Sequence, residues 1–432
     1  MVSIRRRARR ESKRTKFPRS CYYPLEVPAN VSASAEAAGL SPERLNRIRT
    51  HMVKHVESGR LAGGIGLIMR RGHVGFLQTW GRSDTEAGIP MREDAIFRIY
   101  SMTKAVTAVA AMMLFEEGAF VLSDPIAKYL PEFREMRIAV ESYDPATRKT
   151  ILTATAPATR PITILDLMRH TAGFNYAGPH DEKGDFIYPE QGLQPDLRGN
   201  LSSADFIRRL ASIPLVCEPG ATWDYGYGTD VIGRLVEVLS GQTLSEFFGQ
   251  RIFGPLQMAD TAFHVSPEKW DRLVPIYALM PSGTIQRMAG SIQESFREPP
   301  RMFAGGVGLT STVFDYLRFV RMLLNGGELD GERLLSPLTV ELMRSDLLGN
   351  LPVASPLLAT GHGFGLTFAV SKGPACTGTL ASAGQYRWGG AAGTAFWIDP
   401  KQQMVGIFMM QTLLDLAKRN EFMQLAYQSV VD

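Results

Sequence analysis

One segment constrains the fold of this chain more than any other, because it predicts a helix with no polar face. Residues 105–114 read Ala-Val-Thr-Ala-Val-Ala-Ala-Met-Met-Leu, and the first acidic residue after them is Glu116. A helix that is apolar all round is buried on every side. Other elements must therefore enclose it, and a chain of 432 residues, 45% of them hydrophobic, is long enough to do so.

The expected strands lie near the two ends of the chain, and the expected helices lie mostly between them. Short apolar runs predict strands over residues 65–69, 74–80, 394–398 and 404–411. Periodicity and capping residues predict helices over 42–59, 162–169, 229–240, 244–252, 313–324 and 415–430, with an irregular, loop-rich helical region over 122–210. We therefore predict an α/β (α+β) fold: a central antiparallel sheet built from both chain ends, flanked by helices, with an inserted mainly helical domain and a cleft between the two parts.

A hydroxyl and an amine stand three residues apart where the buried helix begins. Ser101-Met102-Thr103-Lys104 directly precedes the apolar run, and residues i and i+3 of a helix share a face. Serine is a weak nucleophile until a neighbour takes its proton, and a buried lysine can do so because burial favours the neutral amine. Backbone N–H groups at a helix start also favour a developing oxyanion. The segment therefore predicts Ser101 as a nucleophile and Lys104 as its base.

The same spacing recurs at Ser266 and Lys269, so the pattern alone is weak. There the lysine is followed by Trp270-Asp271-Arg272 and not by an apolar helix. We expect Lys269 to remain solvated and protonated, which favours Ser101 as the reactive serine.

Five segments, in order along the chain, resemble those of one enzyme superfamily. They are Phe97-Arg98-Ile99-Tyr100-Ser101-Met102-Thr103-Lys104, the run from Ile162 to Gly173, Pro219-Gly220-Ala221-Thr222-Trp223-Asp224-Tyr225, the run from Gly305 to Ser311, and Trp388-Gly389-Gly390. Together they resemble the serine β-lactamase and penicillin-binding protein superfamily, and most of all the class C β-lactamase-like esterases known as family VIII carboxylesterases. The resemblance spans roughly residues 35–430. It implies a serine hydrolase that acts on small, short-acyl carboxylic esters and needs no cofactor or metal.

The resemblance also assigns site residues. It implies that Tyr225 exchanges protons with Ser101 and the leaving group, and that the N–H groups of Ser101 and Ala391 form an oxyanion hole. Trp388, Gly389 and Gly390 would bind substrate, with Tyr227 beside them.

Two departures from the relatives bear on the substrate. Tyr227 stands where penicillin-recognising relatives carry Asn, and Trp388 stands where they carry a lysine that binds the β-lactam carboxylate. An indole cannot replace that charge. We therefore expect neutral esters to be better substrates than β-lactams.

The expected domain arrangement follows from the same comparison and from charge. Residues 1–20 hold nine Lys or Arg residues and one acid, Glu11, and such a segment does not fold alone. We expect residues 1–30 to be a disordered basic arm and 31–432 to be a β-lactamase-like catalytic unit. Within it we place an α/β subdomain at about 31–120 and 335–432 and the helical subdomain at about 121–334.

The sequence also suggests where the protein works and with what. No apolar run follows the arginine pairs as in a secretory signal, and none reaches the ~18 residues of a membrane span. Three scattered cysteines suit a reducing compartment. We predict a cytoplasmic enzyme whose partners are a small ester and, with weaker hydrolysis, β-lactams, with no nucleic acid and no membrane.

Several alternatives share these residues. On the same scaffold the protein could be a β-lactamase or D-alanyl-D-alanine peptidase, an acyltransferase, or a non-catalytic binding protein. His170 with Asp166 suggests a Ser-His-Asp triad, but no Gly-x-Ser-x-Gly elbow occurs, and a structural histidine is the favoured interpretation. His51 and His55, spaced i, i+4, suit a metal but have no third ligand nearby in the sequence, so a solvated helix face is favoured.

Overall fold

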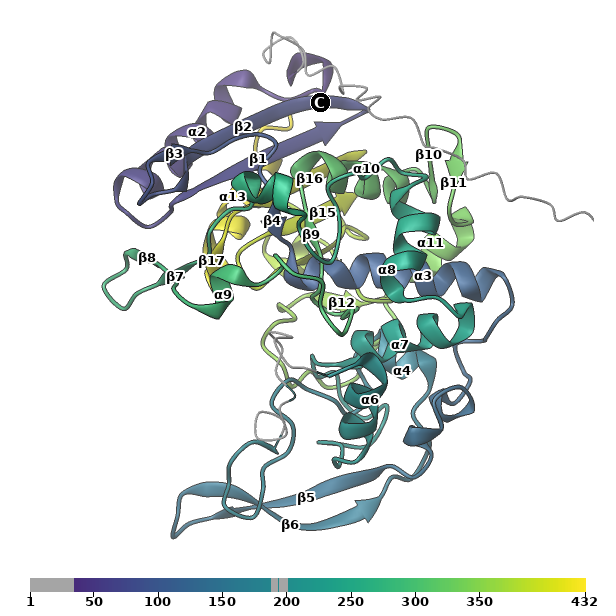
Figure 1. Cartoon of the computed structure of the whole chain (residues 1–432). Coiled ribbons are helices and arrows are strands. Elements are labelled where there is room, and N and C mark those ends of the chain that lie inside the picture. The colour runs from purple at the N-terminus through teal and green to yellow at the C-terminus, as the bar shows by residue number, and fades with distance from the viewer. Residues whose placement is uncertain (1–34, 188–192, 194–200) are drawn as a thin grey trace, which may run out of the picture.

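An eight-stranded antiparallel sheet forms the centre of the computed structural model, which describes residues 35–187, 193 and 201–432 (Figure 1). The basic arm expected at 1–30 lies outside the described residues. In spatial order the strands are β12 (His362–Phe364), β13 (Ala369–Ser371), β14 (Tyr386–Gly389), β15 (Ala395–Asp399), β16 (Met404–Met409), β1 (Gly63–Arg70), β2 (His73–Asp84) and β3 (Ile89–Pro90). The predicted sheet built from both chain ends is confirmed: β1 pairs antiparallel with β16, with Ile65 opposite Met409.

Helices cover both faces of this sheet. On one face, α2 (Pro42–Glu57) and α13 (Ala417–Tyr427) pack over Ile68, Trp80 and Phe408. On the other, α10 (Val313–Leu324) and α3 (Thr103–Glu116) share a core with Leu67 and Ile407. Alternate residues of β1 therefore feed two different cores, because successive side chains of a strand point to opposite faces.

The helix that dominated the sequence is as enclosed as its composition predicts. Every residue of α3 from Thr103 to Leu114 is buried. It packs against α7 (Gly228–Ser240), and α7 packs against α4 (Ile164–Met168) and α8 (Leu244–Phe248). Helix α3 thus joins the sheet to the helical region, and its N-terminus lies where the two meet (Figure 1).

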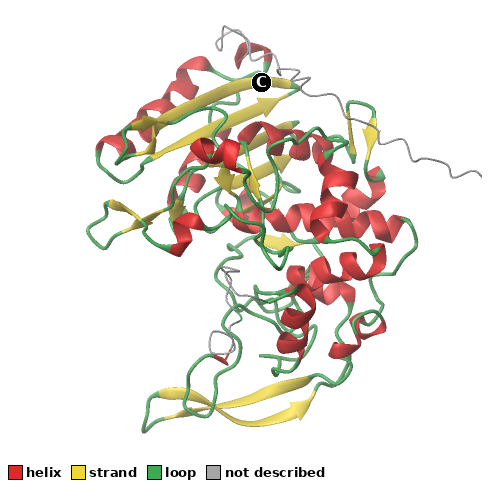
Figure 2. Cartoon of the chain, viewed as in Figure 1, coloured by secondary structure: helices red, strands yellow, loops and turns green. Residues whose placement is uncertain are grey.

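The expectation of an irregular, helical region over 122–210 is wrong for residues 137–157. These form a long antiparallel hairpin of β5 (Arg137–Asp144) and β6 (Lys149–Pro157) at the opposite end of the molecule from α2, as the labels of Figure 1 and the same view in Figure 2 show. None of the residues in these two strands is buried.

Shorter elements complete the described chain. The small strands are β4 (Phe97–Arg98), β7 (Tyr277–Leu279), β8 (Ile285–Arg287), β9 (Thr310–Ser311), β10 (Glu328–Leu329), β11 (Glu332–Arg333) and β17 (Thr412–Leu413). The remaining α-helices are α6 (Ser203–Ala211), α9 (Ser291–Glu294), α11 (Pro337–Met343) and α12 (Pro374–Thr377). None of the helices in the described ranges has the length and apolar character needed to cross a bilayer.

Candidate active site

Ser101 lies at the start of the buried helix, in a short 3₁₀ turn over Tyr100–Met102 that runs directly into α3. The preceding strand β4 is held by β9, with Phe97 opposite Ser311. Tyr100 has φ of 42°, a left-handed conformation that is unusual for a residue with a side chain. Strained backbone of this kind is concentrated at functional sites, where the surrounding structure holds it in place.

The Lys104 amino group lies among three oxygen atoms. Its Nζ lies 3.5 Å from Ser101 Oγ, 2.8 Å from the Tyr176 hydroxyl and 2.8 Å from the Gly306 carbonyl. The side chain is fully buried. The carbonyl can only accept a hydrogen bond, whereas the two hydroxyls can donate or accept, so a neutral amine can receive the Ser101 proton without losing its other contacts.

Tyr225 lies against the same lysine through its ring. Lys104 Nζ is 4.8 Å from the ring centroid, and the Tyr225 hydroxyl accepts a hydrogen bond of 3.0 Å from Trp388 Nε1. Among the described contacts, no hydrogen bond joins the Tyr225 hydroxyl to Ser101 Oγ or to Lys104 Nζ. The structure therefore brings the three predicted residues together around one point, but the phenol that the lysine contacts directly belongs to Tyr176.

Tyr176 and Asp230 are site residues that the sequence did not indicate. Burial, followed by the nearby charges of Tyr225 and Asp230, raises the pKa of Tyr176 well above its usual range, so it remains a neutral phenol. Burial also raises the pKa of Asp230, whereas the charge of Lys104 opposes that rise, and one of its oxygens accepts from Gly306 N at 2.9 Å. Both lie just outside the segments that resemble the enzyme superfamily. Tyr176 is three residues after Gly173, and Asp230 is five residues after Tyr225.

A cavity of about 520 Å³ opens beside Ser101, and its lining is mostly apolar. Ser101, Tyr176 and Tyr225 contribute to one part, and Trp388, Gly389, Gly390 and Ala391 contribute to another. The residues predicted to bind substrate thus border the same cavity as Ser101, with one exception. Tyr227 is fully buried, does not line the cavity, and donates a hydrogen bond of 2.9 Å to the Leu193 carbonyl.

The turn that carries Ala391 is fixed by backbone hydrogen bonds. Gly390 N donates to Thr394 O at 2.8 Å, and the Ala391 carbonyl accepts from Leu414 N at 2.7 Å. This rigidity suits an oxyanion hole, which needs preorganised donors. The participation of the Ser101 and Ala391 N–H groups stays a prediction.

His170 and Asp166 do not form a triad with Ser101. The Asp166 carboxylate accepts from Arg160, Thr163 and Thr171, and it caps α4. Burial, reinforced by the charge of Lys104, lowers the pKa of His170 well below its usual value. Its ring packs on Tyr225, with the centroids 4.7 Å apart. His170 is therefore a neutral packing residue behind the site.

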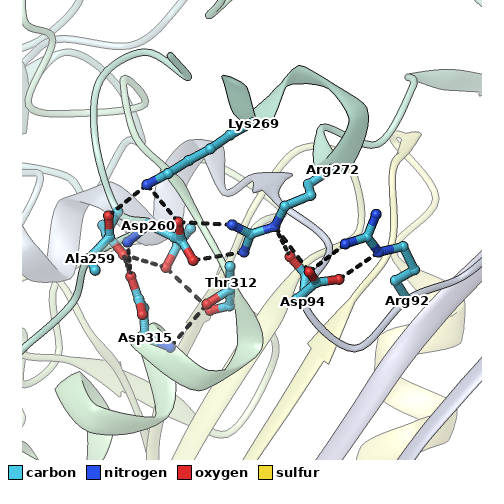
Figure 3. Close-up of polar contacts among 10 residues, drawn as sticks. Arg92, Asp94, Ala259, Asp260, Lys269, Arg272, Thr312 and Asp315 are labelled. Atoms are coloured by element: carbon cyan, nitrogen blue, oxygen red, sulfur yellow. Dashed lines mark hydrogen bonds and ion pairs between the residues drawn. The ribbon is translucent and has the colours of Figure 1, made fainter. Parts of the chain in front are cut away.

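In the second Ser-x-x-Lys segment, the lysine is part of a group of ion pairs. Lys269 lies 2.8 Å from an Asp260 oxygen and donates to the Ala259 carbonyl at 3.1 Å, and Arg272 binds the same aspartate at 2.7 Å (Figure 3). Arg272 also connects this group to Asp94. Lys269 is thus paired with a carboxylate, whereas Lys104 lies beside Ser101 and forms none of the ion pairs found among the described residues.

The scaffold and the buried Ser101–Lys104 pair together make this protein a serine hydrolase. More specifically, the chain belongs to the Beta-lactamase family, whose family model matches residues 48–428.

Individual relatives place it near the esterases of that family. It is 32% identical over 358 residues to Esterase EstB of Burkholderia gladioli, covering 79% of this chain and 83% of EstB. It is 34% identical over 372 residues to Protein Rv1367c of Mycobacterium tuberculosis, covering 84% of this chain and 88% of that protein. The solved structure of EstCE1, a hydrolase with promiscuous acyltransferase activity, matches the fold with a TM-score of 0.73 at 23% identity, covering 92% of this chain and 99% of EstCE1. The predicted resemblance to family VIII esterases is confirmed.

Proposed function

We propose that the protein is a carboxylesterase that cleaves small, short-acyl esters through an acyl-enzyme on Ser101. The observation that carries the proposal is the placement of Lys104 Nζ between Ser101 Oγ and the Tyr176 hydroxyl at the edge of a mainly apolar cavity. The similarity to Esterase EstB supports it.

The first half-reaction forms the acyl-enzyme. Ser101 Oγ attacks the ester carbonyl carbon while Lys104 takes its proton, and the N–H groups of Ser101 and Ala391 stabilise the negative oxygen of the tetrahedral intermediate. The bond to the alcohol then breaks, and the alcohol oxygen takes a proton from Tyr225 or, through Tyr176, from Lys104.

The second half-reaction releases the acid. Water attacks the acyl carbon and gives a proton to the same basic group, and the Ser101 oxygen leaves and recovers its hydrogen. An alcohol can replace the water, in which case the reaction is an acyl transfer. The acyltransferase activity of EstCE1 favours this as a second candidate.

A series of p-nitrophenyl esters of increasing acyl length tests the proposal. We expect turnover with a maximum at short chains and a loss of about 10³-fold or more in Ser101→Ala, since the nucleophile is removed. Nitrocefin in the same assay tests the β-lactamase alternative, and a competing alcohol should reveal any transfer product. Full ester turnover by Ser101→Ala would reject the mechanism, and nitrocefin turnover equal to ester turnover would favour a β-lactamase.

A further inference from the structure

Two arginines line the same cavity without a carboxylate beside them. Arg387 lies on β14 directly before Trp388, and Arg419 lies on α13. In the part of the chain that the structure describes, neither guanidinium forms an ion pair. A contact of 3.5 Å from Arg387 Nη1 to the sulfur of Met423 is the one side-chain hydrogen bond recorded there for either residue.

Both groups keep their charge at neutral pH although they are half-buried. Burial, followed by the charge of Arg387, lowers the pKa of Arg419 to about 10. Burial lowers the pKa of Arg387 as well. Two partly desolvated cations near each other are unfavourable, and a bound anion would relieve both the repulsion and the lost hydration.

Arg419 lies beside the Trp388-Gly389-Gly390 motif, which lines the same cavity as Ser101. A Cβ atom on Gly389 would stand 2.3 Å from Arg419 Nη1, so the guanidinium packs against the bare backbone of the Trp388-Gly389-Gly390 motif. We expected this motif to lack a positive charge because Trp388 stands in the lysine position. The charge is present, but it comes from α13.

We propose that Arg387 and Arg419 bind a carboxylate carried by the substrate, so that the preferred esters are anionic. Guanidinium groups bind carboxylates through paired, charge-assisted hydrogen bonds, which gives them both strength and direction. That the bound molecule is an ester rests on the proposed esterase function, but binding of a carboxylate at the two arginines does not depend on turnover.

Binding of uncleavable amide analogues tests the site independently of catalysis. We would titrate 4-butyramidobenzoate against 4-butyramidobenzamide, and N-phenylglutaramate against N-phenylglutaramide, by calorimetry. The first pair carries the charge on the alcohol side of the reacting bond and the second on the acyl side. In at least one pair the carboxylate should bind about tenfold or more tightly than its amide.

Variants of the two arginines test whether these residues cause the preference for the carboxylate. Arg419→Gln and Arg387→Gln should abolish the preference for the carboxylate, whereas Arg134→Gln, at an exposed position outside the cavity, should retain it. Equal binding of both members in both pairs, or a preference that survives in both cavity variants, would overturn the inference. Failure of the esterase proposal would appear separately, as absent turnover of p-nitrophenyl esters.

A second, independent site lies outside the cavity, where α2 packs against α13. His51 and His55 point from one face of α2 to Glu421 of α13, and their Nε2 atoms lie 2.9 and 2.8 Å from one carboxylate oxygen. The three potential ligand atoms all lie within 4.8 Å of one another. The sequence offered no third ligand for this histidine pair, and the packing of the two chain ends supplies it.

The ligand set suits a divalent transition metal. Zinc binds imidazole nitrogen and carboxylate oxygen at about 2.0–2.2 Å in tetrahedral geometry, which separates ligand atoms by roughly 3.3 Å. The two contacts to the carboxylate are a few tenths of an ångström shorter, and the two imidazole nitrogens lie within 4.8 Å of each other, so side-chain rotations can bring the three ligand atoms to this spacing. The helices are already held together nearby, where Arg47 Nη1 donates to Gln428 Oε1 at 3.0 Å. We infer that His51, His55 and Glu421 form a zinc-binding clamp between the two ends of the chain, with water completing the coordination.

Zinc titration of protein without a histidine tag tests the clamp. We expect one site per chain, an affinity lowered at least about tenfold in His55→Ala and in Glu421→Gln, and no change in His73→Ala, an exposed histidine elsewhere. Zinc should also raise the melting temperature of the wild-type protein and not that of Glu421→Gln. Equal zinc affinity in wild type and Glu421→Gln would overturn the inference.

Discussion

Tyr176 differs from the other aromatic residues of the cavity because its hydroxyl receives the hydrogen bond of Lys104. Removal of that hydroxyl should remove the route through Tyr176 by which Lys104 passes its proton to the leaving alcohol. We predict that Tyr176→Phe lowers kcat by about 10²-fold with little change in KM, since general acid–base groups contribute factors of this size. Steady-state kinetics on a p-nitrophenyl ester measure it, with Tyr143→Phe, which is 63% exposed, as the control. Unchanged kcat in Tyr176→Phe would leave Tyr225 as the sole phenol of the mechanism.

The sequence predicted Lys104 as a site residue but not Tyr176. Ser101 and Lys104 are neighbours on one helix, so their spacing alone brings them together. Tyr225 was found through a motif. Tyr176 and Arg419 reach the site only through tertiary packing, and no local pattern distinguishes them from other tyrosines and arginines. Arg387 directly precedes the predicted Trp388 motif, but the sequence does not show that its side chain lines the cavity.

His170 gives stability a pH dependence whose direction follows from its burial. The pKa of His170 is well below its usual value in the folded protein, and burial lowers the pKa of His362 in the same sense. Below about pH 6.5 the unfolded chain therefore binds protons that the folded protein does not, and folding loses stability as pH falls. Above that pH the histidine is neutral in both the folded and the unfolded state, so it no longer makes stability depend on pH.

Replacing His170 should therefore flatten this decline. Asn is the suitable replacement because His170 has φ of 58°, a conformation that Asn tolerates. Urea unfolding at about pH 7.5 and 5.5 should show a smaller loss of free energy of unfolding in His170→Asn than in wild type. The exposed His73→Asn should behave as wild type, and an equal loss in His170→Asn would show that this residue is not the source.

At the scale of elements, helix α4 depends on one buried carboxylate. Asp166 completes a capping box with Thr163, and Arg160 and Arg169 pair with it. Asp166→Ala would leave the donors of Thr163 and Thr171 without their acceptor. We predict a loss of about 2–3 kcal/mol in the free energy of unfolding, measured by chemical denaturation. Thr243→Ala, which removes the exposed capping box of α8, should cost less, about 1 kcal/mol. The same loss in both variants would mean that burial of Asp166 adds nothing.

Elements with a buried face were predictable, and those without one were not. Helix α2 begins at Pro42 after the Ser41 cap, as the capping signal predicted. Strands β15 and β16 follow their apolar runs because both are fully buried. The β5–β6 hairpin lacks this signal, since exposed strands need no continuous apolar stripe, and it was assigned to an irregular region.

At the scale of the whole molecule, the two chain ends form one structural unit. The α2–α13 layer and strands β1, β2, β15 and β16 share a core, to which Ala381 also contributes. Phe422 lies at its centre, fully buried, with ring contacts to Trp80 and Phe408 at centroid distances of 6.2 and 5.1 Å. These partners come from opposite ends of the chain.

Phe422→Ala should therefore destabilise both ends together. A buried phenylalanine replaced by alanine costs about 3–5 kcal/mol through lost burial and the cavity that remains. Because β14 and α13 also border the active-site cavity, ester hydrolysis and far-UV circular dichroism should be lost at the same temperature, lowered relative to wild type. Leu338→Ala, 80% exposed on α11, should change stability by no more than about 0.5 kcal/mol. Loss of activity in Phe422→Ala well below the temperature at which secondary structure melts would show that the site is uncoupled from this core. In that case the packing of the two chain ends would not be what holds the cavity together.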